Sequence, residues 1–332
     1  MRITRSTLQK IAKDTVAQRV KTDRNLMAAL LVGSTLMEDP FLGHATDIDI
    51  VFVCFNEPES ARQIVKLTNE ITLDLYFVEN AAFEPPRKLR TDSLLGHVMY
   101  DSQPLYETQH FFEYTQAIVR AGFDDPVNVL TRARQHSLPA RELWMEMTLA
   151  GSSRPTDVLK YLQAVYHAAN AVAGLSGPPL TDRRFLLEFA DRARSTGRPE
   201  LNDALLNLLG APNVAAAELI GMLPTWTTAY HAAGNNADFL IHPDRLAYHY
   251  NALEFLLQGN NPIAALWLLI HTWTAAAASL PEYGPEYVAW KAVLEGLGLL
   301  GKGFEEKVQA LDRFLDVTEE LFDGIAADNG IT

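Results

Sequence analysis

The first part of the chain alternates between helical and strand patterns. Apolar residues recur near helical spacing through the first 24 residues, and three later runs rich in Val, Ile, Leu and Phe predict strands. The segment Glu59 to Asn69 is interpreted as a helix, and a short strand is expected at Val98 to Tyr100. The three predicted strands are Leu26 to Val32, Ile48 to Phe55 and Ile71 to Val78.

The strand signal fades after Thr108, and helical patterns separated by prolines follow. With 332 residues, two domains are expected. We predict an α+β domain with a small mixed sheet and flanking helices at residues 1–118, and an all-α helical bundle at residues 119–332. The stretch Ile263 to Leu280 lacks charged residues, but its Thr, Ser, His and Ala content favours a helix buried in the bundle or at a subunit interface over a membrane span.

Composition narrows the classes of function. The chain has 28 basic and 41 acidic residues, so its net charge of −13 disfavours a nucleic-acid partner and suits a cationic small substrate or a protein partner. The only cysteine, Cys54, excludes an internal disulfide framework and a cysteine-based zinc site, which is typical of a cytoplasmic protein. The basic N-terminal segment has no continuous apolar run, so we interpret it as an ordinary first helix rather than a secretory, transit or membrane-surface segment.

Three aspartates interrupt the apolar strand patterns. Asp47 and Asp49 lie two residues apart, so in a strand they project from the same face, and Asp74 lies in the next predicted strand. Like charges this close repel one another, and one or two Mg²⁺ ions would relieve that repulsion while binding substrate phosphates. A solvated strand end or a loop-capping role is the alternative for Asp47 and Asp49.

Gly33 and Ser34 follow the first predicted strand, at an expected helix start. Glycine permits close approach to the backbone, and exposed N–H groups together with the serine hydroxyl can hold phosphate oxygens. Gly33 and Ser34 are therefore candidate phosphate-binding residues. The loop that follows, Thr35 to Asp39, contains two acidic residues and no basic one.

The combination of Gly33-Ser34, Asp47-Ile48-Asp49 and Asp74 resembles the signature of the DNA polymerase beta-type nucleotidyltransferase superfamily, over about residues 1–105. The resemblance implies a Mg²⁺-dependent transferase that moves a nucleoside monophosphate, AMP from ATP, to a hydroxyl of a small molecule. It implies that Asp47, Asp49 and Asp74 bind the metal ions, with Asp74 completing the metal site or acting as the base, and that Ser34 touches the nucleotide phosphates. Many members carry a base shortly after the Gly-Ser, so here the phosphate charge must be neutralised elsewhere.

The order of an α/β region and a helical region is similar to that of small bacterial enzymes that adenylylate antibiotic hydroxyls, such as the kanamycin and streptomycin nucleotidyltransferases. Two other functions stay open. One is an antitoxin-like or protein-adenylylating regulatory nucleotidyltransferase, and the other is a degenerate module that binds a nucleotide without turnover. The acceptor, the preferred nucleotide and the oligomeric state are not determined by the sequence, which is compatible with a homodimer.

The helical half offers further candidates for binding and catalysis. Lys160 and Asn170 share one face of an expected helix over Thr156 to Gly174, where Lys160 could neutralise a triphosphate and Asn170 could bind a base or acceptor. A solvated outer face is the alternative. Glu142 and Glu146 lie one turn apart, and the resemblance to kanamycin-type enzymes makes them candidate general bases, with ordinary surface acids as the alternative.

Three other patterns are interpreted structurally. Thr181 is expected to cap a helix that begins with Asp182 and two arginines, either of which could reach a phosphate or form a surface ion pair. The G-x-G-x-x-G pattern from Gly296 follows a helical rather than a strand pattern, so it predicts a helix end and turn. His242 and His249 lack the spacing of a helical zinc pair and are interpreted as structural histidines.

Overall fold

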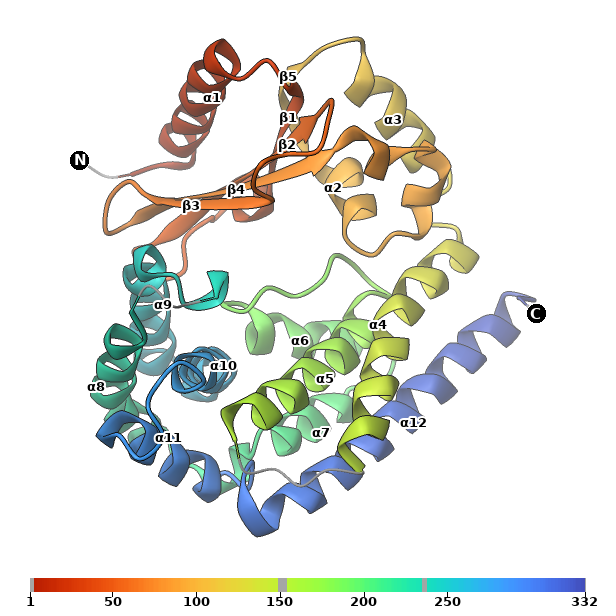
Figure 1. The fold of residues 1–332 in the computed structure, drawn as a ribbon. Coiled ribbons are helices and arrows are strands. Elements are labelled where there is room, and N and C mark those ends of the chain that lie inside the picture. The colour runs from red at the N-terminus through yellow and green to blue at the C-terminus, as the bar shows by residue number, and fades with distance from the viewer. Residues whose placement is uncertain (1–2, 149–153, 235–237, 332) are drawn as a thin grey trace. The chain divides into compact units, whose positions relative to one another are not determined.

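The computed structural model describes residues 3–148, 154–234 and 238–331 (Figure 1). The chain divides into two compact units, residues 1–128 and residues 129–332, which we call the sheet unit and the helical unit. The domain boundary expected at residue 118 stays a prediction, and that residue lies within helix α3 (Phe111–Arg120).

The sheet unit combines one five-stranded sheet with helices. The strand order is β3-β4-β2-β1-β5, and β2 and β4 are parallel while the other neighbours are antiparallel. The expected mixed sheet with flanking helices is therefore present. Its elements are α1 (Arg5–Thr22), β1 (Leu26–Val32), the 3₁₀ turn η1 (Gly33–Leu36), β2 (Thr46–Cys54), β3 (Arg62–Lys66), β4 (Ile71–Glu79), α2 (Leu95–Asp101), β5 (Gln103–Glu107) and α3.

Alternation along the strands separates two faces of the sheet. Ile48 and Ile50 of β2 pack with Leu8 of α1 in one apolar cluster. The intervening positions point the other way, where Val51 packs with Met99 of α2. Asp47, Asp49 and Val51 are two residues apart, so their side chains point to the same face of the sheet. Both carboxylates therefore lie on the face opposite α1.

Two element predictions in this unit are wrong. The segment Glu59 to Asn69 contains the edge strand β3 instead of a helix, because pairing with β4 decides the conformation of this short polar segment. Val98 to Tyr100 lies in helix α2 instead of a strand, and the strand β5 follows directly after it. Met99 is fully buried against the sheet in this helix, so packing explains its apolar character.

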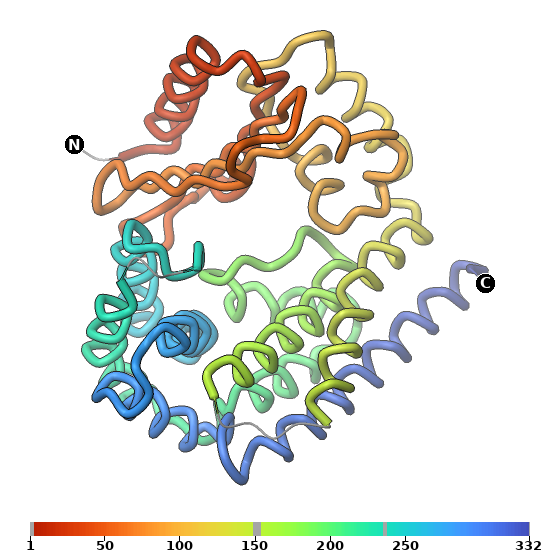
Figure 2. Tube along the Cα trace, viewed as in Figure 1, coloured from red at the N-terminus to blue at the C-terminus, as the bar shows by residue number. Residues whose placement is uncertain are grey.

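The helical unit contains helices and short 3₁₀ turns, and Figure 2 traces its path from the green helices to the blue C-terminal one. Helix α4 continues through Pro139, and its Arg141 bonds to Asp312 of α12. The α-helices of this unit are α4 (Pro126–Thr148), α5 (Pro155–Ala173), α6 (Phe185–Ser195), α7 (Glu200–Leu208), α8 (Ala216–Ala233), α9 (Leu246–Gln258), α10 (Leu266–Ala277), α11 (Pro285–Gly296) and α12 (Phe304–Asp328).

The uncharged stretch Ile263 to Leu280 forms α10 and its flanking turns. Every residue of α10 is buried except His271, as expected of a helix inside a bundle. Within residues 3–148, 154–234 and 238–331, no helix is both long enough and apolar enough to cross a membrane.

Candidate functional site

Three carboxylates meet at one end of the central strands. Asp49 of β2 lies opposite Asp74 of β4 in the parallel register, and Asp47 lies two residues before Asp49 on the same face. Each of the three offers an oxygen, and these oxygens all lie within 4.8 Å of one another. Asp74 is fully buried, Asp47 is 7% exposed and Asp49 is half-buried. The sequence-based expectation that these residues lie together agrees with this geometry, whereas their catalytic roles stay predictions.

Arg62 of β3 is part of the same site and was missed by the sequence analysis. Its Nε donates to Asp74 Oδ1 at 2.8 Å and its Nη2 donates to Asp74 Oδ2 at 2.6 Å, so the ion pair is bidentate. The Tyr76 hydroxyl donates to Asp74 Oδ2 at 3.2 Å, and the Arg62 guanidinium lies 4.7 Å from the centre of the Tyr76 ring. Asp74 is therefore held by two side chains of its own sheet.

Gly33 brings the backbone of the turn after β1 against Asp49. Its φ of +72° lies in the left-handed region, and a Cβ at this position would lie 2.2 Å from Asp49 Oδ2. The helix start expected here is the short 3₁₀ segment η1, and the described residues 37–45 between it and β2 contain no α-helix. Both Gly33 and Asp49 keep some exposure, so a ligand held by the carboxylate would meet the backbone of this turn.

Hydroxyl groups fasten the turn to the start of β2. Ser34 Oγ lies 3.2 Å from Thr46 Oγ1, and Thr46 Oγ1 donates to the carbonyl oxygen of Pro40 at 2.9 Å. The Thr35 hydroxyl donates to the carbonyl oxygen of Asp47 at 3.3 Å. These contacts fix Ser34 beside the strand that carries Asp47 and Asp49.

The donor set fits a hard divalent cation. Mg²⁺ is bound by oxygen ligands, commonly one or two carboxylates with substrate phosphates and water. Asp47 and Asp49 meet that description, and Asp74 meets it less well because both of its oxygens already accept hydrogen bonds from Arg62. Among the described residues one other group lies equally close, at Glu107, His110 and Glu113, and it is largely exposed.

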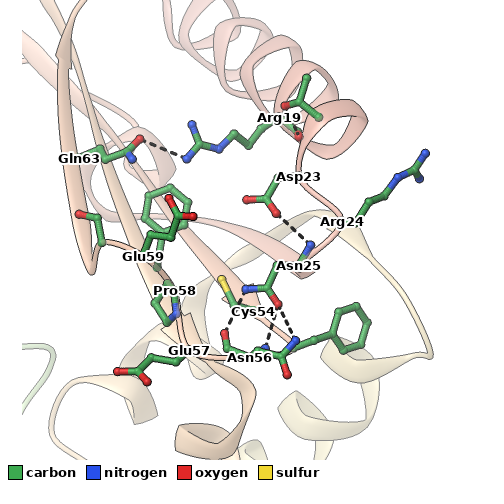
Figure 3. Close-up of a pocket in the computed structure, with 14 residues that line it drawn as sticks. Arg19, Asp23, Arg24, Asn25, Cys54, Asn56, Glu57, Pro58, Glu59 and Gln63 are labelled. Atoms are coloured by element: carbon green, nitrogen blue, oxygen red, sulfur yellow. Dashed lines mark hydrogen bonds between the residues drawn. The ribbon is translucent and has the colours of Figure 1, made fainter.

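A pocket lies at the other end of β2 (Figure 3). It is lined by Arg19, Asp23 and Cys54, among others, and none of the three aspartates contributes to it. Burial raises the pKa of the Cys54 thiol, and Asp23 raises it further, so this cysteine is a poor nucleophile. The pocket is therefore separate from the carboxylate cluster.

The structure places the other predicted nucleotide-binding residue, Lys160, on the surface of the helical unit. Its Nζ donates to Glu146 Oε2 at 2.7 Å, and the two side chains are 44% and 60% exposed. Glu142 is also exposed. The roles of Lys160 in nucleotide binding and of Glu142 or Glu146 as general base stay predictions.

Asn170 has a structural position instead of facing a ligand. It is fully buried, it accepts a hydrogen bond from the Leu180 backbone N–H at 2.6 Å, and it donates to the Tyr166 carbonyl oxygen. His167 on the same face has its Nδ1 3.3 Å from Nδ1 of His136. The face of α5 that carries Lys160 and Asn170 therefore runs from an exposed end at Lys160 to a buried end at Asn170.

The segment from Thr181 also differs from expectation. Helix α6 begins at Phe185, so Thr181 is not its N-cap. Asp182 accepts hydrogen bonds from His271 Nδ1 at 2.8 Å and from Trp267 Nε1 at 2.9 Å. Burial alone would raise the pKa of Asp182, but these partners hold it below its ordinary value. Arg183 is buried with its guanidinium 3.8 Å from the centre of the Tyr248 ring, so it is not a surface ion pair.

The two histidines and the glycine pattern that were interpreted as structural all make contacts or turns within the helical unit. His249 is buried with Nε2 2.9 Å from the Leu240 carbonyl oxygen, and burial lowers its pKa to about 3. His242 Nδ1 accepts the Asp244 backbone N–H. Helix α11 ends at Gly296, and Gly298 has positive φ, as a turn after a helix requires.

Comparison with known proteins adds little. No family model matches the chain, and no curated protein matches it. Among solved structures the chain is similar to a nucleotidyltransferase-like protein from Exiguobacterium sibiricum 255-15, with 10% sequence identity and a TM-score of 0.29 over 88% of this chain and 78% of that chain. A likeness this low supports no inference about fold or function.

Proposed function

We propose that this chain is a Mg²⁺-dependent nucleotidyltransferase that moves AMP from ATP to a hydroxyl of a small molecule. The observation that carries the proposal is the meeting of Asp47, Asp49 and Asp74 within 4.8 Å, beside a glycine turn. Three crowded carboxylates repel one another; Arg62 offsets part of that repulsion at Asp74, and a bound cation would offset more of it, which favours a metal role over a purely structural one.

Asp47 and Asp49 would hold the metal, and Gly33 and Ser34 would meet the nucleotide phosphates. When bound, Mg²⁺ supplies positive charge to the phosphates of the nucleotide. The acceptor oxygen attacks the α-phosphorus in line, a new P–O bond forms, and the bond to pyrophosphate breaks. The chain contributes mainly positioning and charge, because phosphoryl transfer needs little covalent help from the protein.

The proton of the acceptor hydroxyl needs a base. Asp74 is the candidate within the site, and Glu142 and Glu146 stay candidates from the sequence alone. The net charge of −13 favours a cationic acceptor.

A labelled-ATP transfer assay tests the proposal. Full-length protein is incubated with aminoglycosides, lincosamides and proteins as acceptors, with and without Mg²⁺, and pyrophosphate release is measured. Asp49→Asn removes a metal ligand and is expected to lower Mg²⁺-dependent release by about 1,000-fold or more. The exposed Asp14 of α1 provides the matched control, Asp14→Asn, which keeps full activity. Undiminished release in Asp49→Asn contradicts the mechanism.

Two observations favour a second candidate function, nucleotide binding without turnover. The loop after Ser34 has no base, and Asp74 is engaged by Arg62. The same assay separates the two functions, since ATP binding without pyrophosphate release on any acceptor supports the second. Labelling of a protein acceptor would instead support a regulatory, protein-adenylylating enzyme.

A further inference from the structure

Arg62 and Asp74 differ in how deeply they are buried. Asp74 is completely buried on the inner strand β4, whereas the Arg62 side chain is 22% exposed on the edge strand β3. The guanidinium rests on the Tyr76 ring, which lies opposite Arg62 in the antiparallel register. The carboxylate is thus enclosed by the sheet, whereas the guanidinium lies at the partly exposed edge of the sheet.

A divalent cation and the guanidinium compete for the same carboxylate. Both Asp74 oxygens accept charge-assisted hydrogen bonds from Arg62, and Asp47 and Asp49 lie close enough to share a cation with Asp74. A metal ion bound by all three carboxylates would lie close to the positively charged guanidinium of Arg62, and the two cations would repel each other. Metal binding by all three aspartates therefore favours departure of Arg62 from Asp74.

Nucleotide phosphates give the guanidinium a new anionic partner. Arginine binds phosphate through the same planar fork that it uses for carboxylate. The turn that meets the phosphates, Gly33 to Asp39, contributes no basic side chain, and Arg62 is a base in contact with the carboxylate cluster. The two binding events support each other, because the metal replaces Arg62 as the partner of Asp74 and the phosphates replace Asp74 as the partner of Arg62.

We propose that the Arg62–Asp74 ion pair couples metal binding to nucleotide binding, with Arg62 exchanging Asp74 for the nucleotide phosphates. The inference rests on the proposed function. Coupling of this kind is reciprocal, so the nucleotide raises metal affinity by the same factor by which the metal raises nucleotide affinity. Arg62 thereby disfavours binding of the metal alone and favours binding of the metal–nucleotide pair.

Mn²⁺ titrations of the full chain, with and without a non-hydrolysable ATP analogue, measure the coupling directly. In the native protein the analogue is expected to tighten Mn²⁺ binding by about 10-fold or more. Arg62→Gln removes the competitor and the phosphate ligand together. It is expected to tighten Mn²⁺ binding without nucleotide by about 3-fold and to reduce the coupling to about 2-fold or less.

Arg19 provides a matched control. It donates to Gln63 of β3 at 3.3 Å and lies over the Phe77 ring of β4 at 5.0 Å, so it makes a comparable contact to the same two strands at the pocket of Figure 3. Arg19→Gln is expected to leave both affinities and their coupling unchanged. Arg62→Lys keeps a positive charge without the fork and gives intermediate coupling, and it decides the question if Arg62→Gln does not fold.

Two results overturn the inference. If Arg62→Gln weakens Mn²⁺ binding without nucleotide, Arg62 only orients Asp74 as a ligand. If the coupling is unchanged in Arg62→Gln and Arg62→Lys, the ion pair takes no part in it. Tight binding with unchanged coupling leaves the proposed function standing, whereas failure of the native protein to bind Mn²⁺ under any condition contradicts the proposed function as well.

Discussion

Both units of the molecule gather three carboxylates near one arginine, but the two arrangements differ. In the helical unit, Arg141 of α4 reaches three acidic residues of α12 that follow helical spacing. Although its burial alone would lower the pKa of Arg141, these carboxylates raise it above its ordinary value. The three distances are 2.6 Å to Asp312, 2.8 Å to Asp316 and 3.0 Å to Glu319.

In the sheet unit the arginine engages the deepest carboxylate with both nitrogens of its fork. Arg62 holds Asp74, which is fully buried, while Asp47 and Asp49 crowd the same carboxylate. The acids around Arg141 are 37%, 59% and 46% exposed, and among the described residues they do not form a group as close as the sheet aspartates. The two clusters contain the same kinds of residue. The exposure of the carboxylates and the distances between them distinguish the ion pairs that join α4 and α12 from the candidate cation site.

After Asp49→Asn, the largest expected effect is that of Gly33→Ala. The new Cβ would clash with Asp49 Oδ2 at 2.2 Å, and positive φ strains any side chain here. Mg²⁺-dependent pyrophosphate release and Mn²⁺ affinity should fall by about 100-fold or more, since small misplacements of site groups cost that much. Gly197→Ala is the control, because Gly197 has φ of +78° with nothing within 4 Å of a Cβ. Equal activity of the two variants contradicts the described geometry.

Asp74→Asn should destabilise the sheet unit by about 2–3 kcal/mol, because it leaves a partly buried guanidinium without its carboxylate. Urea denaturation measures this loss. The double variant Arg62→Gln/Asp74→Asn should recover part of it, since both charges are then gone. Additive losses in the double variant would show that the ion pair contributes no coupling energy.

Acid sensitivity should come from buried histidines rather than from the exposed acids around Arg141. Burial, with a smaller contribution from His167, lowers the pKa of His136 from 6.5 to about 4, so the unfolded chain takes up a proton at His136 that the folded chain does not. Stability from this residue is complete above pH 6.5 and falls as pH drops toward 4, by up to about 1.4 kcal/mol per pH unit.

His136→Gln should therefore flatten the pH dependence of unfolding between pH 7 and pH 5, as measured by urea denaturation. The exposed His44 supplies the control, His44→Gln, with the native slope. An unchanged slope in His136→Gln would place the acid sensitivity elsewhere.

The smallest expected effect is that of Asp316→Asn. Its carboxylate is 59% exposed and shares Arg141 with two others, so the loss should stay below about 1 kcal/mol. Salt should shrink it further, because surface ion pairs are screened. Thermal unfolding at low and high ionic strength checks both statements, and a loss larger than that of Asp74→Asn would reverse the comparison of the two clusters.

Local patterns predicted much of the candidate site. The alternation of apolar residues in β2 was enough to place Asp47 and Asp49 on one face, and an interrupted apolar strand was enough to single out Asp74. Gly33 after an apolar run marked the turn. These features depend on neighbours along the chain, which the sequence displays directly.

The missed residues depend on pairing between distant segments. Arg62 and Asp74 are 12 residues apart, and Asp182 and His271 are 89 apart, so no local period reveals either contact. Arg62 lies in a short edge strand, and the polar residues of this segment resemble those of an exposed helix, which is why a helix was predicted. The sequence did contain a hairpin signal. Only four residues, Thr68 and Asn69 among them, separate β3 from β4.

The parallel pairing of β2 and β4 has a consequence for how such a site can diversify. Parallel neighbours need a returning segment between them, and here residues 55–70 return the chain and carry β3 along the outer edge of the sheet. The aspartates belong to the inner strands, whereas the arginine belongs to the return. Insertions or substitutions in residues 55–70 can therefore change the positive charge at the site, while the three aspartates on β2 and β4 stay the same.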